Sequence, residues 1–327
     1  MSSVELRAVA ADEAELRLDR WFRRHFPALG HGRLQKLLRT GQIRLDGQRV
    51  EANARLALGQ TIRVPPQAVL GGQDRATFPP ARRSPADALR LEEMILFQDE
   101  TLVVLNKPSG LAVQGGTGTS RHLDGMLAAW RPKERPRLVH RLDRDTSGLL
   151  VVARTASAAA ELTRAFRRHQ VDKLYWALVV GRPTVGRGIV DRPLAKQPGS
   201  RGERVGPDEE GRAARTAYRV VARAGKVASW LALRPLTGRT HQLRAHCALL
   251  GTPIVGDFKY GGAAARLAGA PKGLMLHARE LRLAHPKGGR LAFTAPLSPE
   301  IEAGFAWLGF EPDPSLAGAT LEGFDPP

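Results

Sequence analysis

The sequence is almost without cysteine. A single one, Cys247, occurs among 327 residues. One thiol excludes an intrachain disulfide and a zinc site built from cysteines. Stability must therefore come from a packed core, for which a hydrophobic content of 43% is sufficient.

Long apolar runs are also missing. No stretch approaches the roughly 20 residues that a membrane helix needs. The opening segment, MSSVELRAVAADEAEL, is acidic and lacks the apolar centre of a secretory signal. We therefore expect a cytoplasmic protein without a membrane partner.

Acidic residues are scarce relative to basic ones. The chain carries 50 Lys and Arg against 32 Asp and Glu, a formal net charge of +18. Such an excess favours a polyanionic partner, because it steers nucleic acid to the protein and releases condensed counterions on binding. A genome rich in G and C, which prefers arginine codons, is the alternative source of the excess. The basic footprint predicts nucleic-acid binding.

The length suggests two domains or one large one. Residues 1–65 are predicted to form a small α/β domain, because RLDRWFRRHF has the spacing of an amphipathic helix. The apolar face of this helix would consist of Leu18, Trp21, Phe22 and Phe26. A second helix over Gly32–Leu38 precedes IRLDGQRV, which is typical of a hairpin turning at Asp46-Gly47.

Two other segments have little apolar periodicity and are rich in proline and glycine. Residues 66–90 are predicted to be a mobile linker, and residues 311–327 a disordered tail. Between them, residues 91–310 contain GLLVVAR and KLYWALVVG, which are typical of strands, and SAAAELTRAFRRH, which is typical of an amphipathic helix. The pattern predicts an α+β domain with a mixed or antiparallel sheet.

The densest group of polar residues stands at the mouth of an apolar strand. HRLDRDTSG, at residues 140–148, directly precedes the run Leu149–Ala153. Loops that rigid strands hold in place commonly present catalytic groups. A solvated loop with a capping aspartate is the alternative that the pattern leaves open.

Four segments, in the same order, resemble the signature sequences of the RluA-type pseudouridine synthases. They are NKPSGLAVQGG at 106–116, HRLDRDTSGLLVVART at 140–155, KLYWALVVG at 173–181 and TGRTHQLRAHCALLGTPIVGDFKYG at 237–261. The resemblance implies the fold of that family, isomerisation of uridine to pseudouridine in RNA, and no cofactor. NKPSG with the glycines that follow it resembles the RluC branch, which implies large-subunit rRNA as the substrate.

The resemblance also assigns roles to three residues. Asp143, in HRLD, becomes the catalytic carboxylate, and Arg244 pairs with it and keeps it ionised. Tyr175 stacks on the extruded uracil, or else belongs to the core. Arg141, close to Asp143 in the sequence, is expected to contact RNA and to fill the space that the base vacates. A carboxylate can stabilise or bond to the charge that develops on the sugar. Whether Asp143 attacks the sugar, adds to the base or removes a sugar proton stays open.

Residues 16–65 resemble the S4-type RNA-binding domain. The matching sequences are RLDRWF, GRLQKLLRTGQIRLDGQRV and the closing strand. These residues hold 11 basic and 3 acidic side chains, a net charge of +8. Those expected to bind RNA are Arg33, Lys36, Arg39 and Arg44. The first three recur every third residue and share one helical face, although an ordinary solvated face has the same pattern.

Two alternatives to a monomeric rRNA pseudouridine synthase remain. A non-catalytic RNA-binding or ribosome-assembly factor on the same fold is expected to have lost Asp143, Tyr175 or Arg244, and all three are present. A pseudouridine synthase that acts on tRNA or on small-subunit rRNA is the other.

Three further features are interpreted as unrelated to the chemistry. Asp257-Phe258-Lys259 is similar to the Asp-Phe-Gly of kinases but lacks the glycine. His241 and His246 lie five residues apart on a predicted helix, which is the wrong spacing for a shared ligand face, so we expect both to be structural.

Overall fold

The computed structural model describes residues 4–69, 85–115, 119, 121–131, 134, 136–197, 204–316 and 318–324. The chain divides into two compact units, Met1–Pro79 and Pro80–Pro327. Three sequence predictions fall partly outside the described residues: Gly116 of the NKPSG segment, residues 70–84 of the linker, and residues 317 and 325–327 of the tail.

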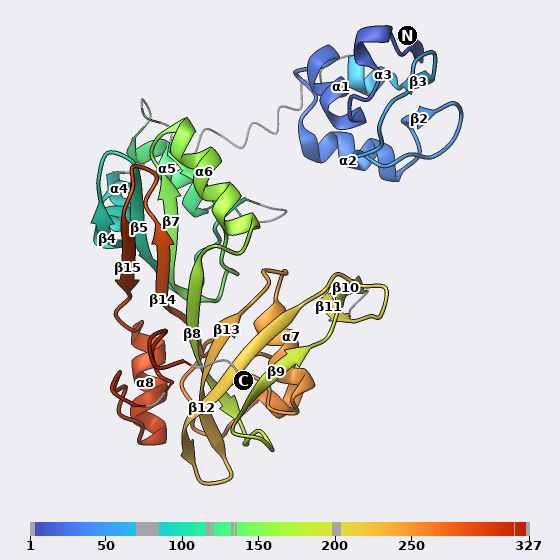
Figure 1. Ribbon diagram of the computed structural model, residues 1–327. Coiled ribbons are helices and arrows are strands. Elements are labelled where there is room, and N and C mark those ends of the chain that lie inside the picture. Colours follow the sequence, from blue (N-terminus) through green and yellow to red (C-terminus); the bar gives the residue numbers. More distant parts are fainter. Residues whose placement is uncertain are drawn as a thin grey trace. The chain divides into compact units, whose positions relative to one another are not determined.

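The first unit is built on a three-stranded antiparallel sheet with the order β1-β3-β2 (Figure 1). Its elements are β1 (Glu5–Ala8), η1 (Ala11–Glu13), α1 (Leu18–His25), α2 (His31–Arg39), β2 (Arg44–Leu45), β3 (Thr61–Val64) and α3 (Pro66–Val69). The predicted apolar face is confirmed, because all four of its side chains are buried in one core with residues of α2 and β3.

The hairpin predicted in this unit is shorter than expected. Asp46 and Gly47 have φ angles of 48° and 75°, as a two-residue hairpin turn requires. After the turn, only a single bridge joins Gln48 to Leu45. The reason is that β2 pairs with the distant strand β3, so the sheet does not depend on the residues that follow the turn.

The second unit contains a ten-stranded sheet with the order β4-β5-β7-β14-β8-β13-β12-β9, to which β15 and β6 add at β14 and β7. Only β7 and β14 run parallel. The strands are β4 (Ile95–Gln98), β5 (Leu102–Lys107), β6 (Arg137–Leu138), β7 (Ser147–Ala153), β8 (Asp172–Val180), β9 (Arg187–Asp191), β12 (Arg215–Ala224), β13 (Ala228–Pro235), β14 (Leu276–Ala284) and β15 (Arg290–Thr294). The α+β class with a mixed sheet is confirmed.

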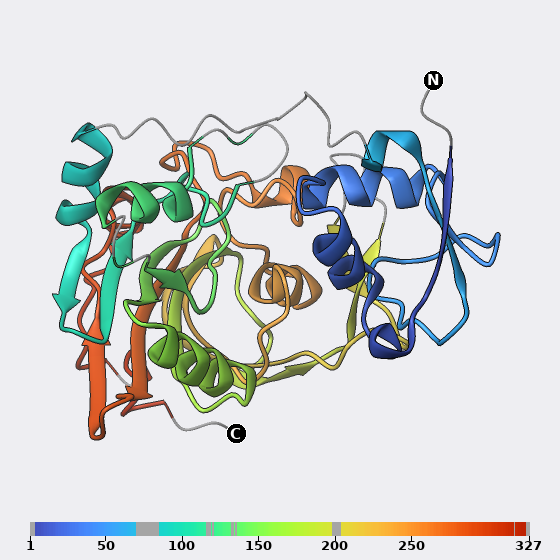
Figure 2. The ribbon, with the colours of Figure 1, turned by 90° about the horizontal axis from the view of Figure 1, so that it is seen from above.

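A separate two-stranded sheet and several helices complete this unit. They are α4 (Pro85–Glu93), α5 (Leu123–Trp130), α6 (Ala156–Arg167), β10 (Leu194–Gln197), β11 (Arg204–Pro207), α7 (Gln242–Leu249), η2 (Gly262–Ala265) and α8 (Pro299–Leu308). Helix α7 lies inside the curve of the sheet, against β12 and β13 (Figure 2). Helix α8 packs Phe305 against Trp176 and Trp230 at ring-centroid distances of 5.8 and 4.9 Å.

Two predictions about unstructured segments were wrong in part. The linker over 66–90 is helical at both ends, where Pro66 and Pro85 begin α3 and α4, since proline is tolerated in the first turn of a helix. The tail over 311–327 contributes Leu321 and Phe324 to the main core, and the indole of Trp176 donates to the Ala319 carbonyl at 2.7 Å. Two apolar side chains and one hydrogen bond to the backbone therefore hold a segment whose proline and glycine content had indicated disorder.

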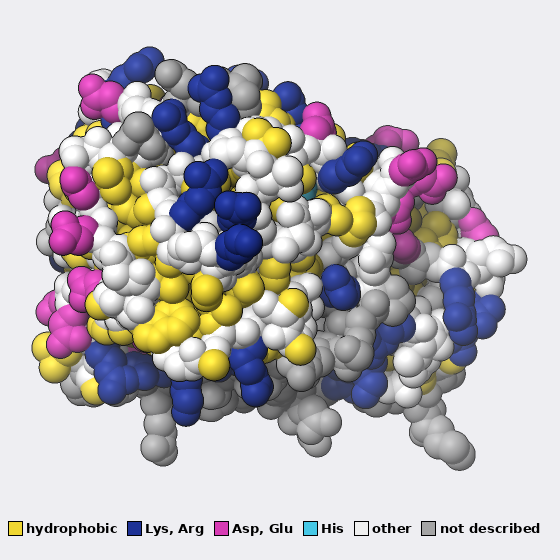
Figure 3. Space-filling model, turned by 90° about the horizontal axis from the view of Figure 1, so that it is seen from below, with side chains coloured by type: hydrophobic (Ala, Val, Ile, Leu, Met, Phe, Trp, Pro, Cys, Tyr) yellow, Lys and Arg dark blue, Asp and Glu magenta, His cyan; other side chains and the backbone are white. Residues whose placement is uncertain are grey.

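The surface carries the basic excess of the sequence. On the face that Figure 3 shows, Lys and Arg side chains lie above and below an area of apolar ones, while Asp and Glu side chains lie along its left side. Within the described part of the chain, no helix is long and apolar enough to cross a membrane.

Candidate active site

The HRLDRDTSG segment forms a loop between two strands of the sheet. It joins β6 to β7, and every residue of β7 is buried. The side chain of Asp143 is 17% exposed at the end of this rigid strand. The loop turns tightly, because the Thr146 amide donates to the carbonyl of Asp143 at 3.2 Å. The buried strand thus fixes where the carboxylate can lie.

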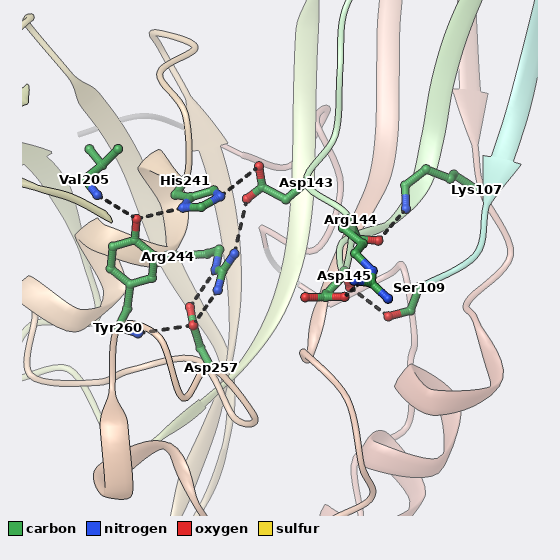
Figure 4. Close-up of polar contacts among 10 residues, drawn as sticks. All are labelled: Lys107, Ser109, Asp143, Arg144, Asp145, Val205, His241, Arg244, Asp257 and Tyr260. Atoms are coloured by element: carbon green, nitrogen blue, oxygen red, sulfur yellow. Dashed lines mark hydrogen bonds and ion pairs between the residues drawn. The ribbon is translucent and has the colours of Figure 1, made fainter. Parts of the chain in front are cut away.

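The end of β5 supports the loop from behind. Lys107 is fully buried, and its Nζ donates to three backbone carbonyls at 2.8–2.9 Å, one of them that of Arg144. Ser109 Oγ donates to the carbonyl of Asp145 at 2.8 Å (Figure 4). Burial lowers the pKa of Lys107 to about 7, against the opposing effect of nearby aspartate charges. Lys107 and Ser109 of NKPSG therefore hold the backbone of Arg144 and Asp145, the two residues that follow Asp143.

His140 anchors the other end of the loop. Its Nε2 accepts a hydrogen bond from the Val151 amide at 2.8 Å, and its ring stacks on Phe166 with centroids 4.0 Å apart. Burial lowers the pKa of His140 to about 3, so the ring is a neutral acceptor. Its role is to hold the loop on β7 and α6.

Gly148 explains the glycine of the motif. Its φ is +104°, and a Cβ there would lie 2.3 Å from the carbonyl oxygen of Ala278 on β14. Only glycine permits both this backbone conformation and this close approach. The parallel contact between β7 and β14 therefore depends on it.

All four of the predicted active-site residues line one cavity of about 360 Å³. They are Arg141, Asp143, Tyr175 and Arg244. The other cationic side chains in its wall are Arg167, Lys173 and Arg239. Among the described residues that line it, Asp143 is the only acid. In this cavity the carboxylate of Asp143 is therefore surrounded by basic side chains.

Tyr175 lies on β8, which pairs with β13 on one side and with β14 on the other. It is opposite Leu233 on β13 and Ala278 on β14, and it packs against both hydrophobic cores of the unit. Its side chain is partly exposed to the cavity. Burial and the charge of Asp143 raise the pKa of the phenol, so the ring is neutral. Tyr175 therefore packs in the core and also lines the cavity that holds Asp143, and its stacking on the uracil stays a prediction.

Arg244 contacts two carboxylates. Its Nε and Nη2 donate to Asp257 at 2.8 and 2.7 Å, whereas its Nη1 lies 3.7 Å from Asp143 (Figure 4). Burial alone would lower the pKa of Arg244, but the hydrogen bonds and charge of Asp257 outweigh it and raise that pKa. The closest partner of Arg244 is therefore not the predicted Asp143, although that contact is present.

Sequence reasoning missed Asp257, which it compared with a kinase motif. Asp257 is 1% exposed and follows Gly256, whose φ is +81°. A Cβ at Gly256 would lie 1.8 Å from the carbonyl of Gly273. The Gly-Asp pair within GDFKYG was the available signal, because a glycine next to a buried acid indicates a constrained polar position.

His241 and Tyr260 were missed as well. His241 Nε2 lies 3.7 Å from Asp143, and its Nδ1 lies 2.8 Å from the hydroxyl of Tyr260. The other predicted structural histidine, His246, is 1% exposed and contacts Thr216 Oγ1 at 2.8 Å, away from the cavity. Of these two histidines, His241 therefore lines the cavity and His246 does not. In the described part of the chain, no group of three or more His, Cys, Asp or Glu residues could hold a metal ion.

The predicted RNA-binding residues belong to the first unit. On α2, Lys36 and Arg39 are exposed and Arg33 is half-buried. Arg44 is also exposed, but its guanidinium donates to the carbonyls of Gly41 and Gly47 at 3.1 and 2.9 Å. Arg44 therefore braces the hairpin turn, while Lys36 and Arg39 of α2 are exposed to solvent.

Comparisons with known proteins agree with this geometry. Residues 101–249 match the profile of the RNA pseudouridylate synthase family. The ribosomal large subunit pseudouridine synthase C of Salmonella typhi is 37% identical over 308 residues, covering 92% of this chain and 95% of that protein. Its namesake in Escherichia coli (strain K12) is 37% identical over 296 residues, covering 88% and 91%.

A solved structure shares the fold. Human RNA pseudouridylate synthase domain containing 4 matches with a TM-score of 0.57 and 28% identity, over 68% of this chain and 96% of that one. Identity of this extent along nearly the whole length of the bacterial relatives leaves one assignment: the chain belongs to the RNA pseudouridylate synthase family.

Proposed function

We propose that this protein converts specific uridines of large-subunit rRNA to pseudouridine, with Asp143 as the catalytic carboxylate. The observation that carries the proposal is the cavity in which Asp143 is the sole acid among the described lining residues, with basic side chains around it and Tyr175 and Arg244 in its wall. The choice of RNA rests on the bacterial relatives, which are named for the large ribosomal subunit.

The chemistry suits this cavity. Breaking the bond between uracil and ribose develops positive charge on the sugar, which a carboxylate stabilises or bonds to. The uracil must first leave its stack, at a cost of a few kcal/mol. A space of about 360 Å³ is in the range of small-ligand pockets and admits a single base. Tyr175 stacks on that base, and Arg141 contacts the RNA from the same loop as Asp143.

The first unit supplies affinity in this proposal. We assign residues 1–65 as an S4-type RNA-binding domain, in which Arg33, Lys36, Arg39 and Arg44 contact phosphates. Residues 91–310 perform the isomerisation. The protein acts as a cytoplasmic monomer.

Mapping pseudouridine at nucleotide resolution tests the substrate. RNA from a strain that lacks the gene is compared with RNA from the same strain carrying the wild-type or the Asp143→Asn gene. We expect one or more large-subunit positions to lose pseudouridine and to regain it only with the wild type. Loss of pseudouridine confined to tRNA would identify tRNA as the substrate in place of large-subunit rRNA. Restoration of pseudouridine by the Asp143→Asn gene would indicate a non-catalytic assembly factor.

A further inference from the structure

His241 occupies an unusual backbone position beside the proposed catalytic carboxylate. It stands immediately before α7 with a φ of 52°, in the left-handed region that favours glycine. Its side chain makes no capping hydrogen bond to the helix. A strained residue whose side chain does not serve its own helix points to a role elsewhere. That side chain reaches from Tyr260 to Asp143 (Figure 4).

The hydrogen bonds around Tyr260 bear on where the protons lie. The Val205 amide can only donate, and it donates to the phenol oxygen of Tyr260 at 3.1 Å. With that oxygen already accepting one bond, we place the hydroxyl proton of Tyr260 in the bond to His241 Nδ1, 2.8 Å away, which makes Nδ1 the acceptor. Burial lowers the pKa of His241 and raises that of Tyr260, so the imidazole carries one proton and the phenol keeps its own.

A neutral imidazole that accepts at Nδ1 carries its proton on Nε2. That nitrogen lies 3.7 Å from Oδ1 of Asp143, while Arg244 Nη1 lies 3.7 Å from Oδ2. Each oxygen of the carboxylate therefore faces one donor. The two donors come from the same segment, at the start and in the first turn of α7.

We propose that His241 and Tyr260 are positioning residues that fix the orientation of Asp143 through a relay from the Val205 amide to the Asp143 carboxylate. The relay rests on the proposed function, because it acts only if Asp143 performs the chemistry. Expulsion of water by an entering base strengthens the His241 contact, since charged hydrogen bonds gain strength where water is excluded. Arg244 holds one oxygen and His241 the other, so the reacting lone pair has a fixed direction.

The relay also ties the small β10–β11 sheet to the active site. Val205 lies on β11, and the guanidinium of its neighbour Arg204 lies over the Tyr260 ring, 5.4 Å from the centroid. Both backbone and side chain of β11 thus hold Tyr260 in place. Displacing β11 would remove the donor that directs the Tyr260 proton to His241.

The sharpest variant is Tyr260→Phe. It keeps the ring, with its edge-on contact to His241 and its cation–π contact with Arg244 at 5.1 Å, and removes only the hydroxyl. We expect the single-turnover rate at saturating RNA to fall by about ten- to a hundredfold, because misplacing a reacting group has effects of that size. The Kd for RNA should stay within about threefold. Tyr218→Phe, which removes a hydroxyl that donates to Val185 in the loop between β8 and β9, is the matched control and should change neither.

The tautomer of His241 gives a readout that a purely structural role would not move. Long-range ¹H–¹⁵N spectra of the histidine rings distinguish the protonated nitrogen from the accepting one. The wild type should show His241 protonated on Nε2, with the signal identified by its loss in His241→Asn. Tyr260→Phe should move population toward the Nδ1-protonated form. Protonation on Nδ1 in the wild type would overturn the relay without any variant.

A double-mutant cycle completes the test. Asparagine tolerates the left-handed backbone, so His241→Asn preserves the turn before α7. If the two residues act as one unit, His241→Asn/Tyr260→Phe should be no slower than His241→Asn alone. Additive losses, or a normal rate for Tyr260→Phe beside an inactive Asp143→Asn, would overturn the positioning role and leave the proposed function intact. A wild type without activity on rRNA would overturn both, whatever the tautomer.

Discussion

Among single residues, Arg244 makes two contacts of different strength, a close one with Asp257 and a longer one with Asp143. The bidentate pair with Asp257 is buried and fixes the guanidinium in one orientation. The 3.7 Å contact with Asp143 lies at the cavity, where substrate can approach. Holding the arginine through a second carboxylate leaves the first one free to react.

Removing this arginine should affect stability and activity separately. Arg244→Leu leaves the buried carboxylate of Asp257 without its cationic partner, which costs about 3–5 kcal/mol of unfolding free energy. It should also abolish isomerisation. Arg244→Lys keeps the charge but loses the planar fork, so we expect a smaller loss of both. Urea denaturation gives the stability, and release of tritium from C5-labelled uridine gives the activity.

The double variant Arg244→Leu/Asp257→Leu is the control for this prediction. It removes both buried charges, so most of the lost stability should return while activity stays absent. Normal turnover by either leucine variant would show that the contact between Arg244 and Asp143 has no part in catalysis.

Tyr175 offers a second test at the level of one side chain. Tyr175→Leu should weaken capture of the extruded base by about 1–3 kcal/mol, the usual range for stacking of a base on an aromatic ring. Tyr175→Phe keeps the ring and should retain most of that capture. Stopped-flow fluorescence of an analogue beside the target uridine follows the extrusion. Equal signals from the leucine variant and the wild type would restrict Tyr175 to core packing.

The sequence could point to Asp143, Arg244 and Tyr175 only through a resemblance, since a charged loop before a strand also fits a solvated turn. It did not indicate that Arg244 pairs with Asp257, because the two residues meet only where the chain turns back after α7. The same holds for His241 and Asp143, which are far apart in the sequence. Pairings of this kind depend on the tertiary fold, and spacing carries no record of them.

Among the elements, the start of α1 depends on a buried acid. Glu13, in η1, is 4% exposed and accepts from the Trp21 indole at 2.9 Å and from the Ala10 amide at 3.1 Å. His25 contacts its other oxygen. Burial raises the pKa of Glu13, but the hydrogen bonds from Trp21, Ala10 and His25 outweigh it and lower that pKa below 4.5. Glu13 therefore links η1 to both ends of α1.

This arrangement predicts a pH dependence of the first unit. Because the pKa of Glu13 is lower in the folded state, its contribution to stability is complete above the unfolded value of 4.5 and is lost as the pH falls through the folded one. Amide protection in α1, measured by hydrogen exchange, should decline over that acid range. Glu13→Gln should lower protection by about 1–3 kcal/mol at neutral pH and flatten the decline. An unchanged acid decline in Glu13→Gln would assign it to other groups.

Element prediction succeeded where periodicity was strong and failed where composition was the only guide. Leu18, Trp21 and Phe22 recur at helical spacing, and α1 formed as expected. The tail had no period, so the burial of Leu321 and Phe324 could not be read from it. Their anchoring depends on the indole of Trp176, which is distant in the sequence.

For the whole molecule, the two units differ in charge and in chemistry. Residues 16–65 carry a net charge of +8, and the described residues that line the cavity around Asp143 belong to the second unit. Binding through phosphates depends on salt, whereas isomerisation of a bound uridine does not. The division of labour is therefore measurable.

Deleting residues 1–79 should flatten the dependence of log K on log salt by about 3, if four phosphate contacts are lost at roughly 0.7–0.9 each. Single-turnover rates on a saturating minimal stem-loop should barely change, while modification of dilute full-length rRNA should fall sharply. Replacing Arg33, Lys36 and Arg39 with alanine keeps the unit and should flatten the slope by about 2 to 3. An unchanged slope would mean that the unit does not grip the RNA backbone. A folded deletion protein that loses its saturated rate would mean that the unit helps to build the active site.

The most direct test of the central claim is tritium release from C5-labelled uridine in large-subunit rRNA by wild type and Asp143→Asn. The substitution preserves the size of the side chain and removes the charge that the reaction needs. Asp143→Asn should release no tritium above background while its affinity for the RNA stays within about tenfold of wild type. Release at a rate near that of the wild type would contradict the assignment of Asp143 as the catalytic carboxylate.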